Sequence, residues 1–227
     1  MIEKFRRFMD GVSARDTEED LLQTIKGVFA GNDMTRVGGA YHQIIEQEAV
    51  IADDGLIGES DGYRIFFTAE QAQPAIEFKR AHIHMIHEVP VKKQSESKIG
   101  PVLVSGRLDG IDGIQIRDTK CKFGPLDLQE YSDSYQWRFY VDMVDGVDLF
   151  YYDFFEFQGF DGLRGEMPFQ LHGLMVADVK SLELCRYGRL SQDCHQLLDE
   201  FLDYLTFRKL FYCLKTVPDP SPINSTI

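Results

Sequence analysis

The feature that most constrains the fold is a pair of strand-like segments joined by a short turn near the middle of the chain. Residues 101–109 and 113–121 are rich in apolar and β-branched side chains, and the sequence Asp-Gly-Ile-Asp-Gly lies between them at 109–113. Aspartate and glycine favour tight turns because they stabilise or tolerate unusual backbone angles. The pattern therefore predicts a β-hairpin against which the other elements must pack.

Helical and strand-like segments alternate along the rest of the chain without a regular repeat. Thr17, followed by three acids, has the chemistry of a helix N-cap. The predicted helices cover 17–29, 35–50, 69–81, 127–144 and 190–211, and the predicted strands cover 84–93, 101–109, 113–121, 148–160 and 169–187. This interleaving predicts an α/β (α+β) fold in which helices flank one mixed central β-sheet.

The length of 227 residues suits a single generous domain, which we expect to span residues 1–215. Residues 216–227 hold three prolines and few apolar side chains, so we expect a flexible tail there. No run approaches the roughly 18 apolar residues that span a bilayer, and the N-terminus lacks a secretory signal. We therefore expect a cytoplasmic protein without membrane contact. The four cysteines form no CxxC pair, which predicts reduced thiols and no iron–sulfur cluster.

The charge of the chain is strongly negative overall but unevenly distributed. A net charge of −13 argues against indiscriminate nucleic-acid binding, which depends on neutralising phosphates. Between residues 79 and 122, however, nine lysines or arginines face five acids, so this stretch carries +4 and the remainder −17. A local positive region on an acidic body suits a protein that admits nucleic acid at one place. Chance variation in surface charge is the alternative explanation.

The second strand of the hairpin ends in charged residues on its apolar face. Side chains alternate along a strand, so Asp118 and Lys120 share a face with Ile116. Burying charges there costs several kcal/mol unless they are paired or hold a metal. Asp109, or Asp112 as the alternative, would lie near Asp118 across the hairpin, and converging carboxylates favour Mg²⁺ or Mn²⁺. These residues predict phosphodiester hydrolysis; taken alone, they would also suit an ordinary ion pair.

This hairpin resembles the RecB-type, phage-exonuclease-like branch of the PD-(D/E)XK nuclease superfamily. In that branch Gly-Arg-x-Asp, a turn and an apolar strand ending in Asp/Glu-x-Lys follow one another, and residues 106–109 and 118–120 match these two motifs. Upstream, residues 38–46 match a helix of the form Gly-x-x-x-His-x-x-x-Glu. Downstream, residues 136–140 match Gln-x-x-x-Tyr, and residues 88–91 are similar to the strand before the hairpin. The motifs occur in the order that the family has.

The resemblance implies a restriction-endonuclease-like core and a DNA nuclease, more specifically an exonuclease of recombination, repair or phage genome processing. It implies that the catalytic residues are Lys120, Asp118 and Asp109. It implies one or two Mg²⁺ or Mn²⁺ ions held by His42, Asp109, Asp118 and the carbonyl of Thr119, and it assigns no role to Glu46. It implies that single- or double-stranded DNA ends are bound by Gln136, Tyr140, Arg107 and Lys122.

Several alternatives stay open at the level of the sequence. A catalytically silent module on the same fold could bind nucleic acid or a partner protein, and a phosphodiesterase acting on RNA would need the same residues. The sequence also leaves open a homo-oligomer and a helicase or recombinase partner. His82 and His84 would form a metal pair or, as the favoured alternative, a polar strand face. The aromatic run at 149–157 suits base stacking but is more typical of sheet core.

Overall fold

The computed structural model describes residues 1–14, 16–28, 31–46, 50–52 and 54–214 of the protein. Within these residues, helices flank two five-stranded mixed sheets, which confirms the predicted α/β (α+β) fold class. The structure has a second mixed sheet beside the predicted one, and it forms mostly from strands that the sequence pattern did not reveal. The tail predicted at 216–227 lies outside the described residues.

The predicted hairpin lies in the sheet that we call the hairpin sheet. Its strands, in the order β10-β7-β6-β5-β4, are β10 (Met175–Cys185), β7 (Leu149–Gln158), β6 (Gln115–Lys122), β5 (Val102–Asp112) and β4 (Ile86–Ser95). Strands β6 and β7 run parallel, and the other neighbours run antiparallel. The turn lies later than predicted, since Asp112 pairs with Gln115 and Asp109 is still part of β5.

The second sheet, which we call the small sheet, is built mostly from residues between two predicted helices. Its order is β1 (Val50–Ala52), β2 (Gly55–Ser60), β3 (Tyr63–Thr68), β9 (Phe169–Leu171) and β8 (Leu163–Arg164). The first three of these strands were not predicted, and Val50 begins β1 instead of ending a helix. The predicted strand at 169–187 is interrupted, because β9 joins the small sheet and β10 joins the hairpin sheet.

The helices follow local capping chemistry. They are α1 (Ile2–Asp10), α2 (Glu18–Ile25), α3 (Asp33–Glu46), α4 (Ala69–Ala81), α5 (Leu128–Asp133), α6 (Tyr135–Met143) and α7 (Leu190–Phe207), followed by a short 3-10 helix at Phe211–Cys213. The Thr17 side chain accepts a hydrogen bond from the Asp20 N–H, as predicted for an N-cap. Ser134 ends α5 and caps α6, so the predicted helix at 127–144 is two helices. No helix among the described residues is both long enough and apolar enough to cross a bilayer.

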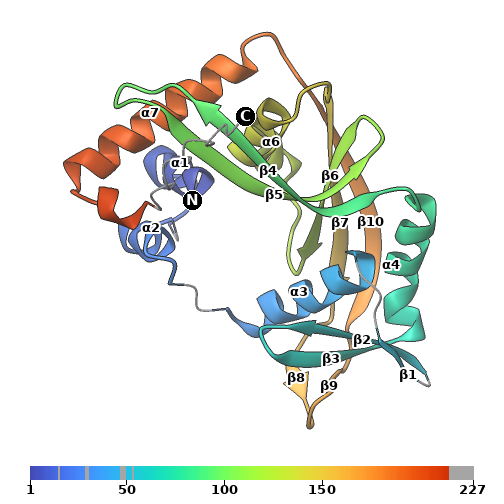
Figure 1. The fold of residues 1–227 in the computed structure, drawn as a ribbon. Coiled ribbons are helices and arrows are strands. Elements are labelled where there is room, and N and C mark those ends of the chain that lie inside the picture. The colour runs from blue at the N-terminus through green and yellow to red at the C-terminus, as the bar shows by residue number, and fades with distance from the viewer. Residues whose placement is uncertain (15, 29–30, 47–49, 53, 215–227) are drawn as a thin grey trace, which may run out of the picture.

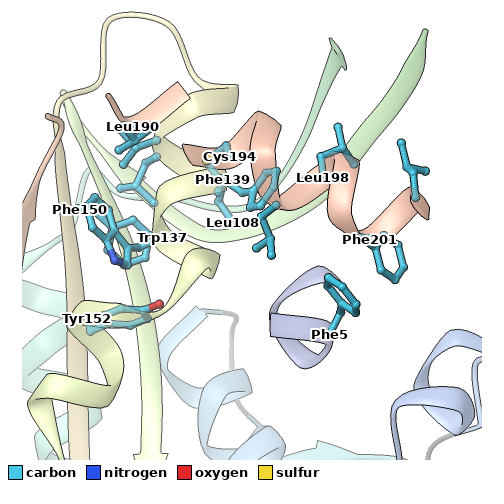
Figure 2. Close-up of a cluster of buried hydrophobic side chains, with 14 of the residues drawn as sticks. Phe5, Leu108, Trp137, Phe139, Phe150, Tyr152, Leu190, Cys194, Leu198 and Phe201 are labelled. Carbon is cyan, nitrogen blue, oxygen red and sulfur yellow. The ribbon is translucent and has the colours of Figure 1, made fainter. Parts of the chain in front are cut away.

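Two apolar clusters cover opposite faces of the hairpin sheet, and β7 contributes to both. Phe150, Tyr152 and Phe154 belong to the cluster formed with α1, α2, α6 and α7. Figure 2 shows Phe150 and Tyr152 beside Trp137 of α6, and Figure 1 shows where these helices lie. Phe155 and Phe157, with the opposite parity, pack with α3, α4 and the small sheet. The aromatic run at 149–157 is therefore core on both faces of the sheet, as the sequence favoured.

Candidate functional site

Helix α3 carries two polar side chains toward the hairpin sheet. His42 and Glu46 are four residues apart and so lie on one face of the helix. The Nδ1 atom of His42 is 3.0 Å from Thr119 Oγ1, 3.2 Å from Glu46 Oε1 and 3.8 Å from Asp109 Oδ2. One nitrogen thus faces three oxygens, two of them from carboxylates. This arrangement brings residues of the helix motif and of the hairpin motif together.

Close packing between α3 and the sheets depends on a small residue in the middle of the helix. A Cβ atom on Gly39 would lie 2.3 Å from Ser60 Oγ, so a larger residue would push the helix away from β2. A Cβ atom on Gly38 would make only an ordinary contact of 3.5 Å with Cys121. The close approach of α3 to β2 therefore involves Gly39 and not Gly38.

Asp109 reaches this cluster from β5. The pairing of β5 with β6 stops at Gly110 and Arg117, so the next residue on each strand has no ladder partner on the other. In place of the ladder, the Thr119 N–H donates to Asp109 Oδ2 at 2.9 Å. Ligand atoms of His42, Glu46 and Asp109 all lie within 4.8 Å of one another. These three residues could therefore share one metal ion.

Asp118 and Lys120 lie on the other face of β6, as strand alternation predicted. Asp118 is 1% exposed, and its Oδ1 accepts a hydrogen bond of 3.0 Å from Gln136 Nε2 on α6. Its Oδ2 forms an ion pair with Lys120 Nζ but has no hydrogen-bond partner among the described residues. The Lys120 side chain remains 26% exposed. The buried carboxylate therefore has capacity for another ligand.

The electrostatics of these residues follow from burial and crowding of like charge. Burial, opposed by Lys120 and reinforced by Asp109, raises the pKa of Asp118 to about 6. Burial also raises the pKa of Glu46. Burial alone would lower the pKa of His42, but the neighbouring Cys121, Glu46 and Asp109 raise it well above its ordinary value. An imidazolium thus neutralises a cluster of carboxylates, which is the electrostatic role that a metal cation would fill.

The two sets of residues meet at an open cleft of about 660 Å³. Its lining includes His42, Glu46, Glu88, Asp109, Lys120 and Cys121. Asp118 lies behind this lining and is connected to the cleft through Lys120. The cleft therefore offers a nitrogen ligand, several carboxylates and one ammonium group to a molecule that enters it.

The residues predicted to contact DNA are placed in different ways. Gln136 holds Asp118, and the Tyr140 hydroxyl donates to the Arg107 carbonyl at 2.9 Å, so both residues act on the wall of the site. A Cβ on Gly106 would lie 2.7 Å from the Tyr140 ring, which explains a glycine in this motif. Arg107 is exposed and forms an ion pair of 2.7 Å with Glu88.

Lys122 and Asp112 do not join the cluster. The Lys122 Nζ atom lies 5.2 Å from the centre of the Tyr131 ring, and Lys122 is not part of the cleft lining. Asp112 binds His82, with 2.7 Å between Oδ2 and Nδ1, so the hairpin carboxylate at the site is Asp109. The expectation that His82 and His84 align on a strand was wrong, because they follow the end of α4.

Two cleft residues carry features that the sequence did not reveal. Glu46 was seen only as part of a motif, although its spacing from His42 was a usable signal for a shared ligand set. Glu88 has φ +55 within β4, between residues paired with Gly110 and Leu108. Such a left-handed residue in a strand re-aims the side chain, and here the carboxylate lies at the cleft. Nothing in the local sequence indicates that conformation.

Comparisons with known proteins add little to this geometry. No protein-family model and no curated protein matches the chain. A solved structure described as "Crystal structure of SSO0001" is similar with a TM-score of 0.41 and 10% identity, covering 58% of this chain and 56% of that one. The chain thus spans little more than half the length of that protein, and a likeness this weak carries no argument about function.

Proposed function

We propose that this protein is a metal-dependent DNA nuclease, and more specifically an exonuclease. The observation that carries the proposal is the buried Asp118, whose one oxygen is bound by Gln136 and whose other oxygen has only the Lys120 ion pair. Buried charges with perturbed pKa values beside a cleft are candidates for functional sites, because keeping a charge out of water costs free energy that its partners must offset. Asp109 and His42 lie close enough to the Asp118–Lys120 pair to influence its electrostatics.

The donor set fits a hard divalent cation. His42, Glu46 and Asp109 supply a nitrogen and carboxylate oxygens within reach of one another, and Asp118 Oδ2 has the Lys120 ion pair as its one partner among the described residues. We propose that these residues, with the Thr119 carbonyl that the family resemblance implies, hold Mg²⁺ or Mn²⁺. A bound cation would supply an activated water and neutralise charge on the scissile phosphate.

The protein side chains have separate tasks in this proposal. Lys120, kept protonated by its carboxylate neighbours and partly exposed to the cleft, can donate to a phosphate oxygen or orient the attacking water. Gln136 fixes the orientation of Asp118. The Thr119 hydroxyl and N–H fix His42 and Asp109 relative to each other.

Two measurements on the full chain test the proposal. Calorimetric titration with Mn²⁺ should show stoichiometric binding, and with Mg²⁺ or Mn²⁺ the protein should progressively shorten end-labelled linear DNA and leave closed circles intact. Cleavage of closed circles would overturn the exonuclease assignment, and preference for an RNA of the same sequence would overturn the DNA assignment. Absence of both metal binding and cleavage would favour a catalytically silent binding module.

A further inference from the structure

A second hollow adjoins the cleft beyond the end of β6. It measures about 340 Å³ and lies within the size range of ligand sites. Met34 and Phe123 line both this hollow and the cleft that holds Lys120, so the two hollows adjoin at these side chains, and we refer to them together as the groove. The groove therefore leads from the candidate catalytic residues to the loop after β7.

Three aromatic rings that contact one another contribute to the lining of the second hollow, whose exposed surface is otherwise mostly polar. The Phe123 ring lies 4.9 Å from Phe157 and 5.4 Å from Phe160, measured between ring centres. Phe157 is buried in the core, whereas Phe123 and Phe160 are partly exposed. A flat ligand could thus stack on rings whose positions are already fixed, which reduces the entropy lost on binding.

The two hollows differ in the charged side chains that line them. No lysine or arginine is among the described residues that line the second hollow, and its one acid, Glu156, is paired with Lys180 at 2.6 Å. Lys120 is the one lysine or arginine among the described residues that line either hollow. The first hollow sets Lys120 among the carboxylates of Glu46, Glu88 and Asp109, so it suits a phosphate together with the divalent cation of the proposed function. The second hollow suits an uncharged planar group.

Phe123 follows Lys120 by three residues, which is at most about 10 Å along an extended chain. From this spacing we infer that the second hollow takes an unpaired nucleobase of the strand whose phosphate lies at Lys120. This inference rests on the proposed nuclease function and makes single-stranded nucleic acid its substrate class. A base stacked inside a duplex could not reach the rings, and duplex binding draws on many phosphate contacts that a groove with one lysine does not offer.

Binding of fluorescently labelled oligothymidylate tests the inference without cleavage, once with EDTA and once with Ca²⁺. Phe123→Leu keeps the apolar volume but removes the π face, and it should weaken binding about 5- to 150-fold, the effect of losing one base–aromatic stack. Phe123→Trp should preserve binding. An oligonucleotide with abasic sites should bind the unaltered protein as weakly as intact oligothymidylate binds Phe123→Leu. A hairpin duplex should compete poorly with labelled oligothymidylate for the unaltered protein. Phe207→Leu, a change at an 81% exposed ring on α7, is the matched control and should bind normally.

The outcomes distinguish failure of the inference from failure of the proposed function. Equal affinities of Phe123→Leu and the unaltered protein, or equal affinities for abasic and intact strands, would overturn the inference even if the protein cuts DNA. Stacking-dependent binding by a protein that never cleaves DNA would leave the inference standing and remove the nuclease assignment. If Phe123→Leu lowers the melting temperature, Phe160→Leu probes the same hollow, and normal strand affinity in that variant would also overturn the inference.

Discussion

Two acid–base pairs on neighbouring residues of β6 have opposite character. Arg117, on the face toward α4, donates to both oxygens of Asp153 at 3.0 and 2.9 Å, and Ser181 donates to the same carboxylate. Asp118, on the opposite face, has one oxygen held by Gln136 and the other without a hydrogen bond among the described residues. The first carboxylate is saturated, and the second retains capacity beside a cleft.

The difference separates, within a single strand, a carboxylate with a structural role from one to which the proposed function assigns a role. Both carboxylates are almost fully buried, so burial alone does not distinguish them. The Arg117 side chain is 11% exposed and locked against Asp153, whereas the Lys120 side chain is 26% exposed and reaches the cleft. In the first pair the Asp153 carboxylate is fully hydrogen-bonded, although Arg117 Nε has no hydrogen-bond partner among the described residues. In the second pair Asp118 Oδ2 has only its ion pair with Lys120, so Asp118 could bind a metal and Lys120 a phosphate instead.

The largest effect should come from breaking the saturated pair. Asp153→Asn should lower the free energy of unfolding by about 3–5 kcal/mol, because it leaves the Arg117 guanidinium buried without a counter-charge. Asp118→Asn should not lower it, since Lys120 can turn toward solvent in the cleft. Urea denaturation followed by circular dichroism measures both values. Equal losses in the two variants would mean that both pairs are structural.

The rate of DNA cleavage should depend on the Asp118–Lys120 pair, although the stability of the fold should not. Asp118→Asn and Lys120→Ala should each reduce the rate of Mn²⁺-dependent DNA cleavage by about 100- to 1000-fold, the usual cost of removing one electrostatic group from a reaction centre. Lys98→Ala removes a lysine that also pairs with an aspartate, at 3.0 Å from Asp203, but on the surface. It should cleave at the original rate. Undiminished cutting by both site variants at matched folding would refute the assigned roles.

The raised pKa of Asp118 should make the stability of the protein depend on pH. The pKa of Asp118 in the folded state is about 6, above its ordinary value of 3.8, so the folded protein binds the extra proton between these values. Its contribution to stability is therefore fully present below about pH 4 and is lost as the pH rises through about 6. The free energy of unfolding should fall by about 1–3 kcal/mol relative to that of Asp118→Asn across this window. A constant difference between the two proteins would contradict the raised pKa.

The smallest of these effects concerns Thr119, which lies between Asp118 and Lys120 in the sequence and faces α3. Thr119→Val removes the hydroxyl that lies 3.0 Å from His42 Nδ1 and keeps the N–H that holds Asp109. Mn²⁺ affinity measured by calorimetry should fall about 10- to 100-fold, as for other groups that orient a ligand. Thr119→Ser retains the hydroxyl and should bind normally. Unchanged affinity of the valine variant would show that His42 is oriented by other contacts.

The predictable parts of the fold were those fixed by neighbours in the sequence. The bounds of α4, the Thr17 cap and the existence of the β5–β6 hairpin all follow from periodicity, capping and turn chemistry. The small sheet was missed because β1, β2 and β3 are short, and their stability comes from pairing with each other and packing under α3. The hairpin turn was misplaced because strand pairing extends β5 through a sequence that also suits a turn.

For the site, the sequence by itself determined which residues share a face of one element. Strand alternation placed Asp118 with Lys120, and helical spacing placed His42 with Glu46. Only the tertiary structure decided that α3 lies against Thr119, that Asp109 meets this cluster while Asp112 binds His82, and that Gln136 holds Asp118. The reason is physical: periodicity is local, whereas the meeting of distant elements depends on how their apolar faces are buried together.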